Sequence, residues 1–422
     1  LLGAPPGRTS VVFVDDLNMP ALEKYGAQPP IELLRQVLSQ GGFYDLKKLF
    51  FKKVQNTAFV AACGPPGGGR NPLTARLVRH FNLLWVPELA EESMQAIFGA
   101  ILDGFLKAHP FAAEPAALAT PLVAATMAIY GAMKLEMLPT PSKSHYTFNL
   151  RDISKVVQGM LLITPPKCED ADALLRLWCH ETQRVFCDRL VSTTDRGWFA
   201  TKMATVLKEK VAKEWAEDDF RSLLFGSYMN ASKGASVAPY EACEMKASQA
   251  KFADYLGDYN LATTKPMNLV FFSDACAHLA RISRVITQPR GCALLVGVGG
   301  SGRQSLVRLA AAMWEFSCHT IEITRTYDVS AFHDDLKRFM FEAGCDAKPV
   351  VFLFSDTQIV KESFLEDINN ILNSGEVPNL LANDEWEKAT SAVRPLAKDL
   401  GIPETKDNLK QLFISRVREN LH

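Results

Sequence analysis

The chain has 422 residues, of which 48% are hydrophobic and 22% are charged, and its formal net charge is −1. This length and hydrophobic content are sufficient for two or three buried cores. A chain with so little net charge lacks the basic field expected of a protein that binds nucleic acid or an anionic membrane, so both partners are excluded. Its nine cysteines contain no C-x-x-C pair, which favours a reducing compartment over a disulfide framework.

The first predicted strand ends in two acidic residues. Residues 11–14 form an apolar run, and Asp15 and Asp16 follow it directly. In P-loop enzymes a buried strand of this kind carries the aspartate that holds Mg²⁺, and often a second acid that activates water. A helix and a polar loop are predicted next, and residues 58–63 form a second apolar strand.

A glycine-rich segment, GPPGGGRNPLTARLVRH, follows this second strand. Arg76 and Arg79 are three residues apart, so they are expected to share a helix face. Arginines in this position can reach a phosphate that a neighbouring module binds, which is the role of an arginine finger. The alternative interpretation is a solvated basic helix end.

From Ala90 to about residue 230, apolar residues recur at helical spacing, which predicts a helical subdomain. The longest uncharged stretch, residues 115–133, is rich in Ala and Thr and is interrupted by Pro121, so we interpret it as a subdomain helix and not a membrane span. His180 and the residue after it begin a zincin motif, but Arg184 stands where the second histidine is required, which argues against zinc.

The most informative motif is GVGGSGRQS, which follows the apolar run 293–296 and opens an amphipathic helix. At such a strand-to-helix turn, backbone N–H groups and the helix dipole are expected to face a polyanion. A polar connection is predicted before it, over residues 226–253, followed by a helix near Ser273. The residues of the predicted phosphate-binding loop are Gly297, Val298, Gly299, Gly300, Ser301, Gly302, Arg303, Gln304 and Ser305.

Two nucleotide motifs fit this loop, and they differ in the ligand. Compared with G-x-x-x-x-G-K-[ST], the loop has Arg303 in place of the lysine and Gln304 in place of the hydroxyl that binds Mg²⁺. As G-x-G-x-x-G it matches a dinucleotide fingerprint, with Glu322 near the position that binds the ribose. A glycine turn without any ligand is the third interpretation.

A later apolar strand, residues 350–354, ends in Ser355, Asp356 and Thr357. The corresponding strand of P-loop enzymes carries a metal-binding Asp and often a catalytic Glu, but only one carboxylate is present here. If Asp356 binds the metal, Thr357 occupies the base position, whereas if Asp356 is the base, Ser355 has replaced the metal ligand. Neither register supports fast hydrolysis, and the alternative role of Asp356 is to cap the next helix.

Taken together, these residues resemble the motor ring of the dynein heavy chain, and its axonemal branch in particular. The resemblance covers nearly the whole chain. It implies AAA+ modules, each with a parallel sheet flanked by helices: residues 1–88 end the third large subdomain, 89–235 form its helical small subdomain, and 236–422 begin the fourth large subdomain. The segments that carry the resemblance are VVFVDDLNMPALEKYGAQPPIELLRQ, ACGPPGGGRNPLTARLVRHFN, HYTFNLRDISKVVQGML, HETQRVFCDRL and GVGGSGRQSLVRLA.

The resemblance also implies roles for residues of the third module. Asp15 and Asp16 match its Walker B pair, with Asp15 as the Mg²⁺ ligand, and the phosphate-binding loop of this module would precede Leu1. Asp16 stands where many AAA+ proteins have Glu, and its shorter side chain holds the attacking water less well. Gly64 stands where the cytoplasmic branch has the sensor Asn, so no side chain there can orient that water.

The remaining site residues are implied in the same way. Arg76 and Arg79 match the finger region, Arg151 matches the sensor II arginine, and Asp356 matches the Walker B site of the fourth module, with Mg²⁺ as its ion. Backbone amides and glycines do most of the phosphate binding and are retained, while Gln304 weakens the positioning of Mg²⁺. We therefore expect a fourth module that binds ATP or ADP and hydrolyses it slowly or not at all.

At the level of the whole protein, the resemblance implies an ATP-driven microtubule motor of the cytoplasm and cytoskeleton, located in the axoneme of cilia or flagella. The implied partners are microtubules, neighbouring AAA+ modules, and intermediate and light chains bound through the tail. Two alternatives remain, a structural AAA+ scaffold whose loop stays empty and a dinucleotide-dependent oxidoreductase.

Overall fold

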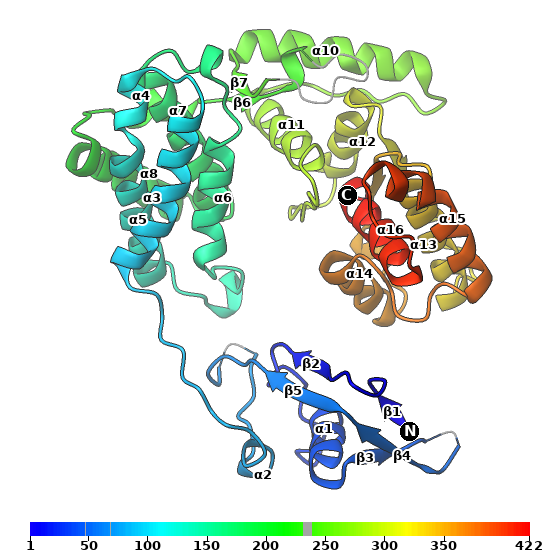
Figure 1. Ribbon diagram of the computed structural model, residues 1–422. Coiled ribbons are helices and arrows are strands. Elements are labelled where there is room, and N and C mark those ends of the chain that lie inside the picture. Colours follow the sequence, from blue (N-terminus) through cyan, green and yellow to red (C-terminus); the bar gives the residue numbers. More distant parts are fainter. Residues whose placement is uncertain (47, 68, 231–238) are drawn as a thin grey trace. The chain divides into compact units, whose positions relative to one another are not determined.

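The computed structural model describes residues 1–46, 48–67, 69–230 and 239–422. Within this part of the chain two compact units are present, Leu1–Leu89 and Ala90–His422, and each is described by itself. The N-terminal unit combines short strands with few helices, whereas the C-terminal unit is mostly helical (Figure 1). Both contain parallel strands accompanied by helices, so the predicted α/β fold class is confirmed.

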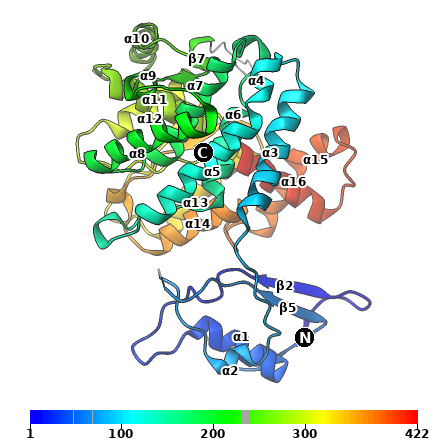
Figure 2. The ribbon, with the colours of Figure 1, turned by 90° about the vertical axis from the view of Figure 1, so that its left-hand side faces the viewer.

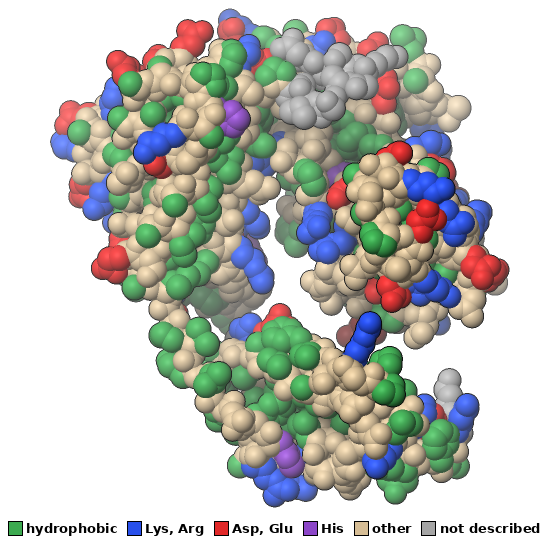
Figure 3. Space-filling view, in the orientation of Figure 1, with side chains coloured by type: hydrophobic (Ala, Val, Ile, Leu, Met, Phe, Trp, Pro, Cys, Tyr) green, Lys and Arg blue, Asp and Glu red, His purple; other side chains and the backbone are tan. Residues whose placement is uncertain are grey.

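A parallel strand pair forms the centre of the N-terminal unit. β2 (Ser10–Val14) and β5 (Thr57–Ala61) pair in register, with Val14 opposite Ala61. Because parallel strands run in one direction, the residues that follow each strand meet at the same edge of the sheet. Hydrophobic side chains remain visible at the surface of this unit (Figure 3), and Phe13 is 61% exposed. The helices of the unit are α1 (Pro29–Gln40) and α2 (Ala75–Val78).

The prediction of a polar loop between α1 and β5 is wrong, because this segment contains a hairpin. β3 (Gly42–Tyr44) pairs antiparallel with β4 (Phe51–Gln55), and β1 (Leu2–Gly3) adds to β4 in parallel. The rings of Tyr44 and Phe51 meet edge to face across the hairpin, with 5.1 Å between centroids. Aromatic residues favour strands, and the contact between Tyr44 and Phe51 stabilises the strand pairing although polar residues lie between the two strands.

Helices dominate the first half of the C-terminal unit. α3 and α5 lie side by side in both views (Figures 1 and 2), and their apolar faces contribute to one core. In that core Trp178 is fully buried, and its indole N–H donates to Thr126 Oγ1 at 2.8 Å. The helices are α3 (Glu91–Ala108), α4 (Ala113–Ala117), α5 (Ala119–Glu136), α6 (Leu150–Met160), α7 (Ala171–Thr182), α8 (Thr193–Val206) and α9 (Glu217–Arg221), with π-helical turns at Gln183–Cys187 and Leu207–Val211.

A second α/β region completes the C-terminal unit. β8 (Ser317–His319) and β9 (Val350–Phe352) pair in parallel, and Leu421 also bridges to Val350 in parallel. β6 (Phe225–Gly226) and β7 (Glu241–Ala242) form a separate antiparallel pair. The helices are α10 (Met245–Ala262), α11 (Ser273–Ile286), α12 (Arg303–Met313), α13 (Val329–Gly344), α14 (Ser363–Ser374), α15 (Asn383–Asp399) and α16 (Lys406–Asn420).

Two predictions for this region are wrong. Residues 293–296 form no strand, because no strand of the described chain lies beside them to bond their backbone groups; Leu294 is 91% exposed and Val296 85%. The predicted polar connection, residues 226–253, is not only a connection, because it includes β7 and the first half of α10; its residues 231–238 lie outside the described ranges. The helix predicted near Ser273 is confirmed as α11.

Truncation of Trp178 tests the core of the helical bundle. We expect Trp178→Ala to lower the free energy of unfolding by about 3–5 kcal/mol, because it opens a large cavity and leaves the Thr126 hydroxyl without its donor. Denaturant unfolding followed by far-UV circular dichroism measures this change. Trp85→Ala is the control, since Trp85 is 84% exposed and its loss is expected to change the value by less than about 0.5 kcal/mol.

Candidate nucleotide sites

The glycine loop before α12 has the backbone of an anion-binding turn. Gly300 and Gly302 have φ values of 78° and 77°, in the left-handed region that favours glycine, and Gly302 caps the helix. A Cβ built on Gly299, Gly300 or Gly302 would meet nothing within 4 Å. The loop backbone is therefore accessible to a ligand at the N-terminus of a helix of 11 residues.

Arg303 lies against this loop. Its Nη2 donates to the carbonyl oxygen of Val298 at 3.3 Å, so the guanidinium turns back over the glycines. Gln304 is exposed, and Ser305 is half-buried one residue further along the helix. The loop thus contains a cation and an accessible glycine backbone, which suits a phosphate, and it offers an amide where Mg²⁺ would need a hydroxyl.

Asp356 opens a short 3₁₀ turn, Asp356–Gln358, and three residues separate it from the end of β9 at Phe352. Its Oδ1 accepts the backbone N–H of Thr357 at 3.0 Å, and the side chain is exposed. Gln358 braces the turn, since its Oε1 accepts from Ser355 N at 2.7 Å and its Nε2 donates to Ile321 O at 2.6 Å. In the described chain no hydrogen bond or ion pair joins Ser355 or Asp356 to the glycine loop. That Asp356 and this loop form one nucleotide site therefore stays a prediction.

The acids after β2 line a small cavity in the N-terminal unit. Asp16 has φ 47°, which Asp tolerates better than most residues, and its backbone N–H donates to Asp15 Oδ1 at 3.0 Å. Carboxylate oxygens beside a cavity are the ligands that Mg²⁺ prefers, so these residues suit that ion. The cavity has a volume of about 180 Å³ and is lined by Val14, Asp15, Asp16, Leu17, Pro20, Pro30, Ile31 and Leu34.

A neighbouring asparagine was not predicted. Asn18 is 2% exposed, and its Nδ2 donates to Gly64 O at 2.8 Å, which ties the loop after β2 to the loop after β5. Its Oδ1 is buried and accepts no hydrogen bond from any described residue. Only its place in the DDLNMP segment, two residues after the acid pair, could have drawn attention to it.

The predicted arginines lie outside this cavity. Arg76 is exposed in α2, and Arg79 caps that helix while its Nε donates to His80 Nε2 at 3.4 Å. Arg151 is exposed in the first turn of α6, where its backbone N–H donates to Asn149 Oδ1 at 2.9 Å. All three guanidinium groups are therefore accessible, as finger or sensor residues need to be, but their partners stay predictions.

A buried charge cluster around Glu181 is the feature that sequence reasoning missed. The Glu181 carboxylate is fully buried, and it accepts from Arg184 Nε at 2.9 Å and from Arg284 Nη2 at 3.2 Å. Tyr240 donates its hydroxyl at 2.7 Å. Gly159 makes room for the cluster, because a Cβ there would lie 1.8 Å from Glu181 Oε2. The cluster thereby joins α7 to α6, to α11 and to Tyr240, the residue before β7.

Burial and the cationic partners act in opposite directions on this cluster. Burial alone would raise the pKa of the Glu181 carboxyl, but Arg184 and Arg284 outweigh it and hold that pKa below its usual value. Burial lowers the pKa of His180 to about 3, so this imidazole is neutral in the folded chain, with Nδ1 at 3.1 Å from Leu223 O. Among the described residues, no group of His, Cys, Asp and Glu is arranged to hold a metal ion.

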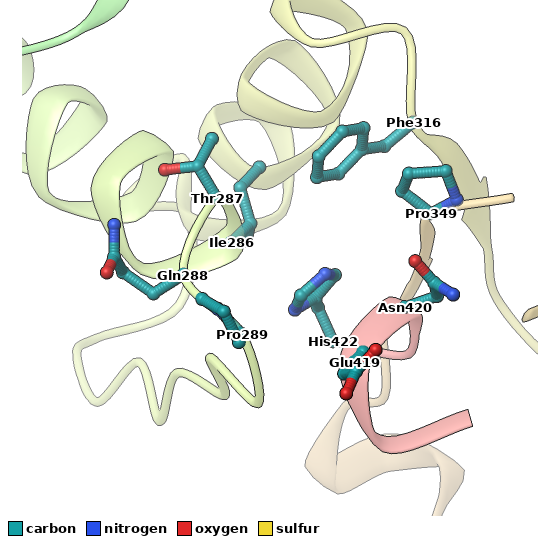
Figure 4. Close-up of a pocket in the computed structure, with 9 residues that line it drawn as sticks. All are labelled: Ile286, Thr287, Gln288, Pro289, Phe316, Pro349, Glu419, Asn420 and His422. Carbon is teal, nitrogen blue, oxygen red and sulfur yellow. The ribbon is translucent and has the colours of Figure 1, made fainter. Parts of the chain in front are cut away.

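A second cavity lies in the C-terminal unit (Figure 4). The ring of His422 stacks on Phe316 with 5.8 Å between centroids, and burial lowers the pKa of His422. None of the predicted site residues lines this cavity, so it is not part of the candidate nucleotide site. It has a volume of about 310 Å³ and is lined by Ile286, Thr287, Gln288, Pro289, Phe316, Pro349, Glu419, Asn420 and His422.

The open glycine loop on α12, together with the acids that follow β2 and β9, defines a chain built from P-loop-type nucleotide-binding α/β modules. Family models agree with this class over three parts of the chain. Residues 1–89 match the P-loop containing dynein motor region, residues 101–196 the dynein heavy chain ATPase lid domain, and residues 267–422 the P-loop containing dynein motor region D4. The chain therefore belongs to the dynein heavy-chain family.

Comparison with individual proteins agrees with the family. Dynein axonemal heavy chain 6 of Homo sapiens is 48% identical over 426 residues, which cover 100% of this chain and 10% of that protein. Dynein axonemal heavy chain 1 of Homo sapiens is 48% identical over 435 residues, with the same coverage. The Dynein-1-beta heavy chain of the flagellar inner arm I1 complex of Chlamydomonas reinhardtii is 43% identical over 427 residues, which cover 99% of this chain and 9% of that protein. The chain thus spans about a tenth of the length of these relatives.

Removing the charge of Glu181 tests the buried cluster. We expect Glu181→Gln to lower the free energy of unfolding by about 3–5 kcal/mol, because two guanidinium groups lose their counter-charge in a buried site. Chemical denaturation of the purified chain measures this value. Glu92→Gln, an exposed substitution in the first turn of α3, is expected to cost less than about 0.5 kcal/mol, and equal losses would contradict the assigned role.

The buried neutral imidazole predicts a dependence of stability on pH. His180 binds a proton near pH 6.5 when unfolded but only near about pH 3 when folded, so protons favour the unfolded chain between these values. As the pH falls below 6.5, the free energy of unfolding should therefore decrease by up to about 1.4 kcal/mol per pH unit from this residue. Denaturant midpoints measured between about pH 7 and pH 5 should show a shallower slope for His180→Gln. An unchanged slope would contradict this prediction.

Proposed function

We propose that this chain is part of the motor ring of an axonemal dynein, an ATP-driven microtubule motor of cilia and flagella. The family match and the names of the relatives support this assignment. In this proposal residues 1–88 and 89–235 belong to the third AAA+ module and residues 236–422 to the fourth. Microtubules, intermediate chains and light chains would be bound by other parts of the heavy chain, and the neighbouring modules of the ring are the direct partners of this region.

In the fourth module the glycine loop holds ATP or ADP and supplies little or no hydrolysis. The observation that carries this proposal is the open backbone at Gly299, Gly300 and Gly302 before α12, with the Arg303 guanidinium beside it. Asp356 would hold Mg²⁺, which would neutralise phosphate charge when bound. Gln304 offers no hydroxyl to the ion, and β9 is followed by one acid instead of two. Binding is thereby favoured over turnover.

In the third module Asp15 would hold Mg²⁺ and Asp16 would occupy the position that activates water. Arg151 would sense the nucleotide of this module, and Arg76 and Arg79 would face the site of the preceding module. The exposure of all three arginines is compatible with these roles. Together the two modules would regulate or transmit the cycle of the ring, while its main turnover occurs elsewhere in the heavy chain.

Nucleotide release from the full heavy chain tests this function. The motor is purified without added nucleotide and denatured, and the released compounds are separated by chromatography. Gly302→Asp, which places a side chain and a negative charge at φ 77°, and Arg303→Ala are each expected to reduce the released ADP or ATP by one site per ring. Arg308→Ala, on the same helix but outside the loop, is the matched control and should release as much as wild type.

Other outcomes would select the alternatives. Unchanged release from Gly302→Asp and Arg303→Ala would mean that the loop is empty and that the module is a structural scaffold. Release of a nicotinamide dinucleotide would favour an oxidoreductase and overturn the motor assignment.

A further inference from the structure

Arg70 contacts one of the two acids that follow β2. Its Nη2 donates to Asp16 Oδ1 at 3.0 Å, and its Nε points to the same oxygen at 3.4 Å. Because both donors share one oxygen, this is not the two-oxygen fork that makes arginine–carboxylate pairs strong. The contact involves the acid that matches the water-activating position, and Arg70 precedes the two arginines of the predicted finger region.

Gly64 leaves the space that the Arg70 side chain occupies. A Cβ at position 64 would lie 3.0 Å from Arg70 Nε, 3.1 Å from Cδ and 3.2 Å from Cζ. These distances are tighter than most Cβ contacts, so a side chain at this position would push the Arg70 side chain by a few tenths of an ångström. The glycine therefore removes a side chain that could orient water and, at the same time, admits Arg70 to the carboxylate.

The loops that carry these residues are held together without Arg70. Asn18 Nδ2 donates to Gly64 O at 2.8 Å, and the backbone N–H of Asn71 donates to Asn18 O at 2.9 Å. The Asn71 side chain adds a hydrogen bond to Pro20 O at 2.8 Å. Because these bonds fix the backbone on both sides, the guanidinium can leave the carboxylate while the two loops stay in place.

The exposure of both side chains indicates a weak contact. The side chains of Arg70 and Asp16 are 39% and 47% exposed. Ion pairs with this much exposure contribute little to stability, since water screens the charges and two side chains lose freedom. A structural brace would be better buried, as the Glu181 cluster is. The pair is instead suited to a contact that forms and breaks.

We propose that Arg70 is a latch on Asp16, a positioning residue that restrains hydrolysis in the N-terminal module. While the latch is engaged, the two contacts of the guanidinium with Asp16 Oδ1 fix the orientation of the carboxylate, so that it is not free to turn toward the attacking water. When the latch opens, the carboxylate becomes available to that water. The inference rests on the proposed function, because it takes Asp16 as the second Walker B acid.

Nucleotide turnover of the full heavy chain tests the latch. Arg70→Met is expected to raise the turnover of this site by up to about fivefold, which corresponds to about 1 kcal/mol at 1.4 kcal/mol per tenfold change. Gly64→Ala should act in the same direction, because its methyl group pushes the Arg70 side chain, and Arg70→Lys should lie between Arg70→Met and wild type. Arg35→Met removes a partly exposed ion pair of 2.7 Å with Glu32 on α1, so it is the matched control and should change nothing.

Double variants attribute the gain to this site. The increase should disappear when Arg70→Met is combined with Asp16→Asn, whereas a general loosening of the fold would not depend on this carboxylate. Unchanged turnover in both Arg70→Met and Gly64→Ala, or a gain that survives Asp16→Asn, would overturn the latch. Release of nucleotide from the Gly302→Asp chain concerns the other unit, so that test can fail or succeed independently of this one.

Discussion

The buried carboxylate of Glu181 is the constraint on which the C-terminal unit depends. An isolated charge in such a site would cost several kcal/mol, so the carboxylate is tolerable only while its partners remain in place. One partner, Arg184, lies within the next turn of the same helix, whereas Tyr240 and Arg284 are 59 and 103 residues further along the chain. The cluster therefore ties the helical half of the unit to the α/β half that follows it, and Asp188 adds a second tie through its ion pair with Arg281.

The same helix that holds Arg284 also anchors the helix of the glycine loop. Ser283, next to Arg284 on α11, accepts a hydrogen bond at 2.7 Å from the indole N–H of Trp314, which caps the C-terminal end of α12. α12 begins at the glycine loop, so a continuous set of buried contacts runs from Glu181 to the element that presents the candidate phosphate site. A displacement of the helical half therefore changes the orientation of α12, unless one of these contacts breaks.

Local patterns explain which parts of this molecule could be predicted from its sequence. The acids after β2, the glycine turn before α12 and the helix at Ser273 each depend on a few adjacent residues, and apolar spacing or glycine chemistry specifies them. Residues 293–296 have the composition of a strand, but a strand also needs a neighbour to bond it, which composition cannot supply. Pairs such as Arg70 with Asp16, 54 residues apart, carry no local signal. The segment HETQRVFCDRL contains the clearest local indication of a contact that was not predicted, since Glu181 and Arg184 are three residues apart. Only the fold shows that the carboxylate of this pair is buried.

The two candidate sites have a backbone that suits phosphate or acids that suit a metal ion, and they depart from the P-loop consensus in different ways. At the glycine loop the missing hydroxyl at Gln304 and the single acid after β9 are fixed properties of the chain, which no movement can restore. At the other site both acids are present, and one of them is engaged by a guanidinium that is more than one-third exposed. A contact of that kind responds to small displacements of the surrounding loops, because its free energy is close to that of the open state. We infer that the first site is suited to holding a nucleotide and the second to having its hydrolysis adjusted, so that the two modules regulate a ring by different physical means.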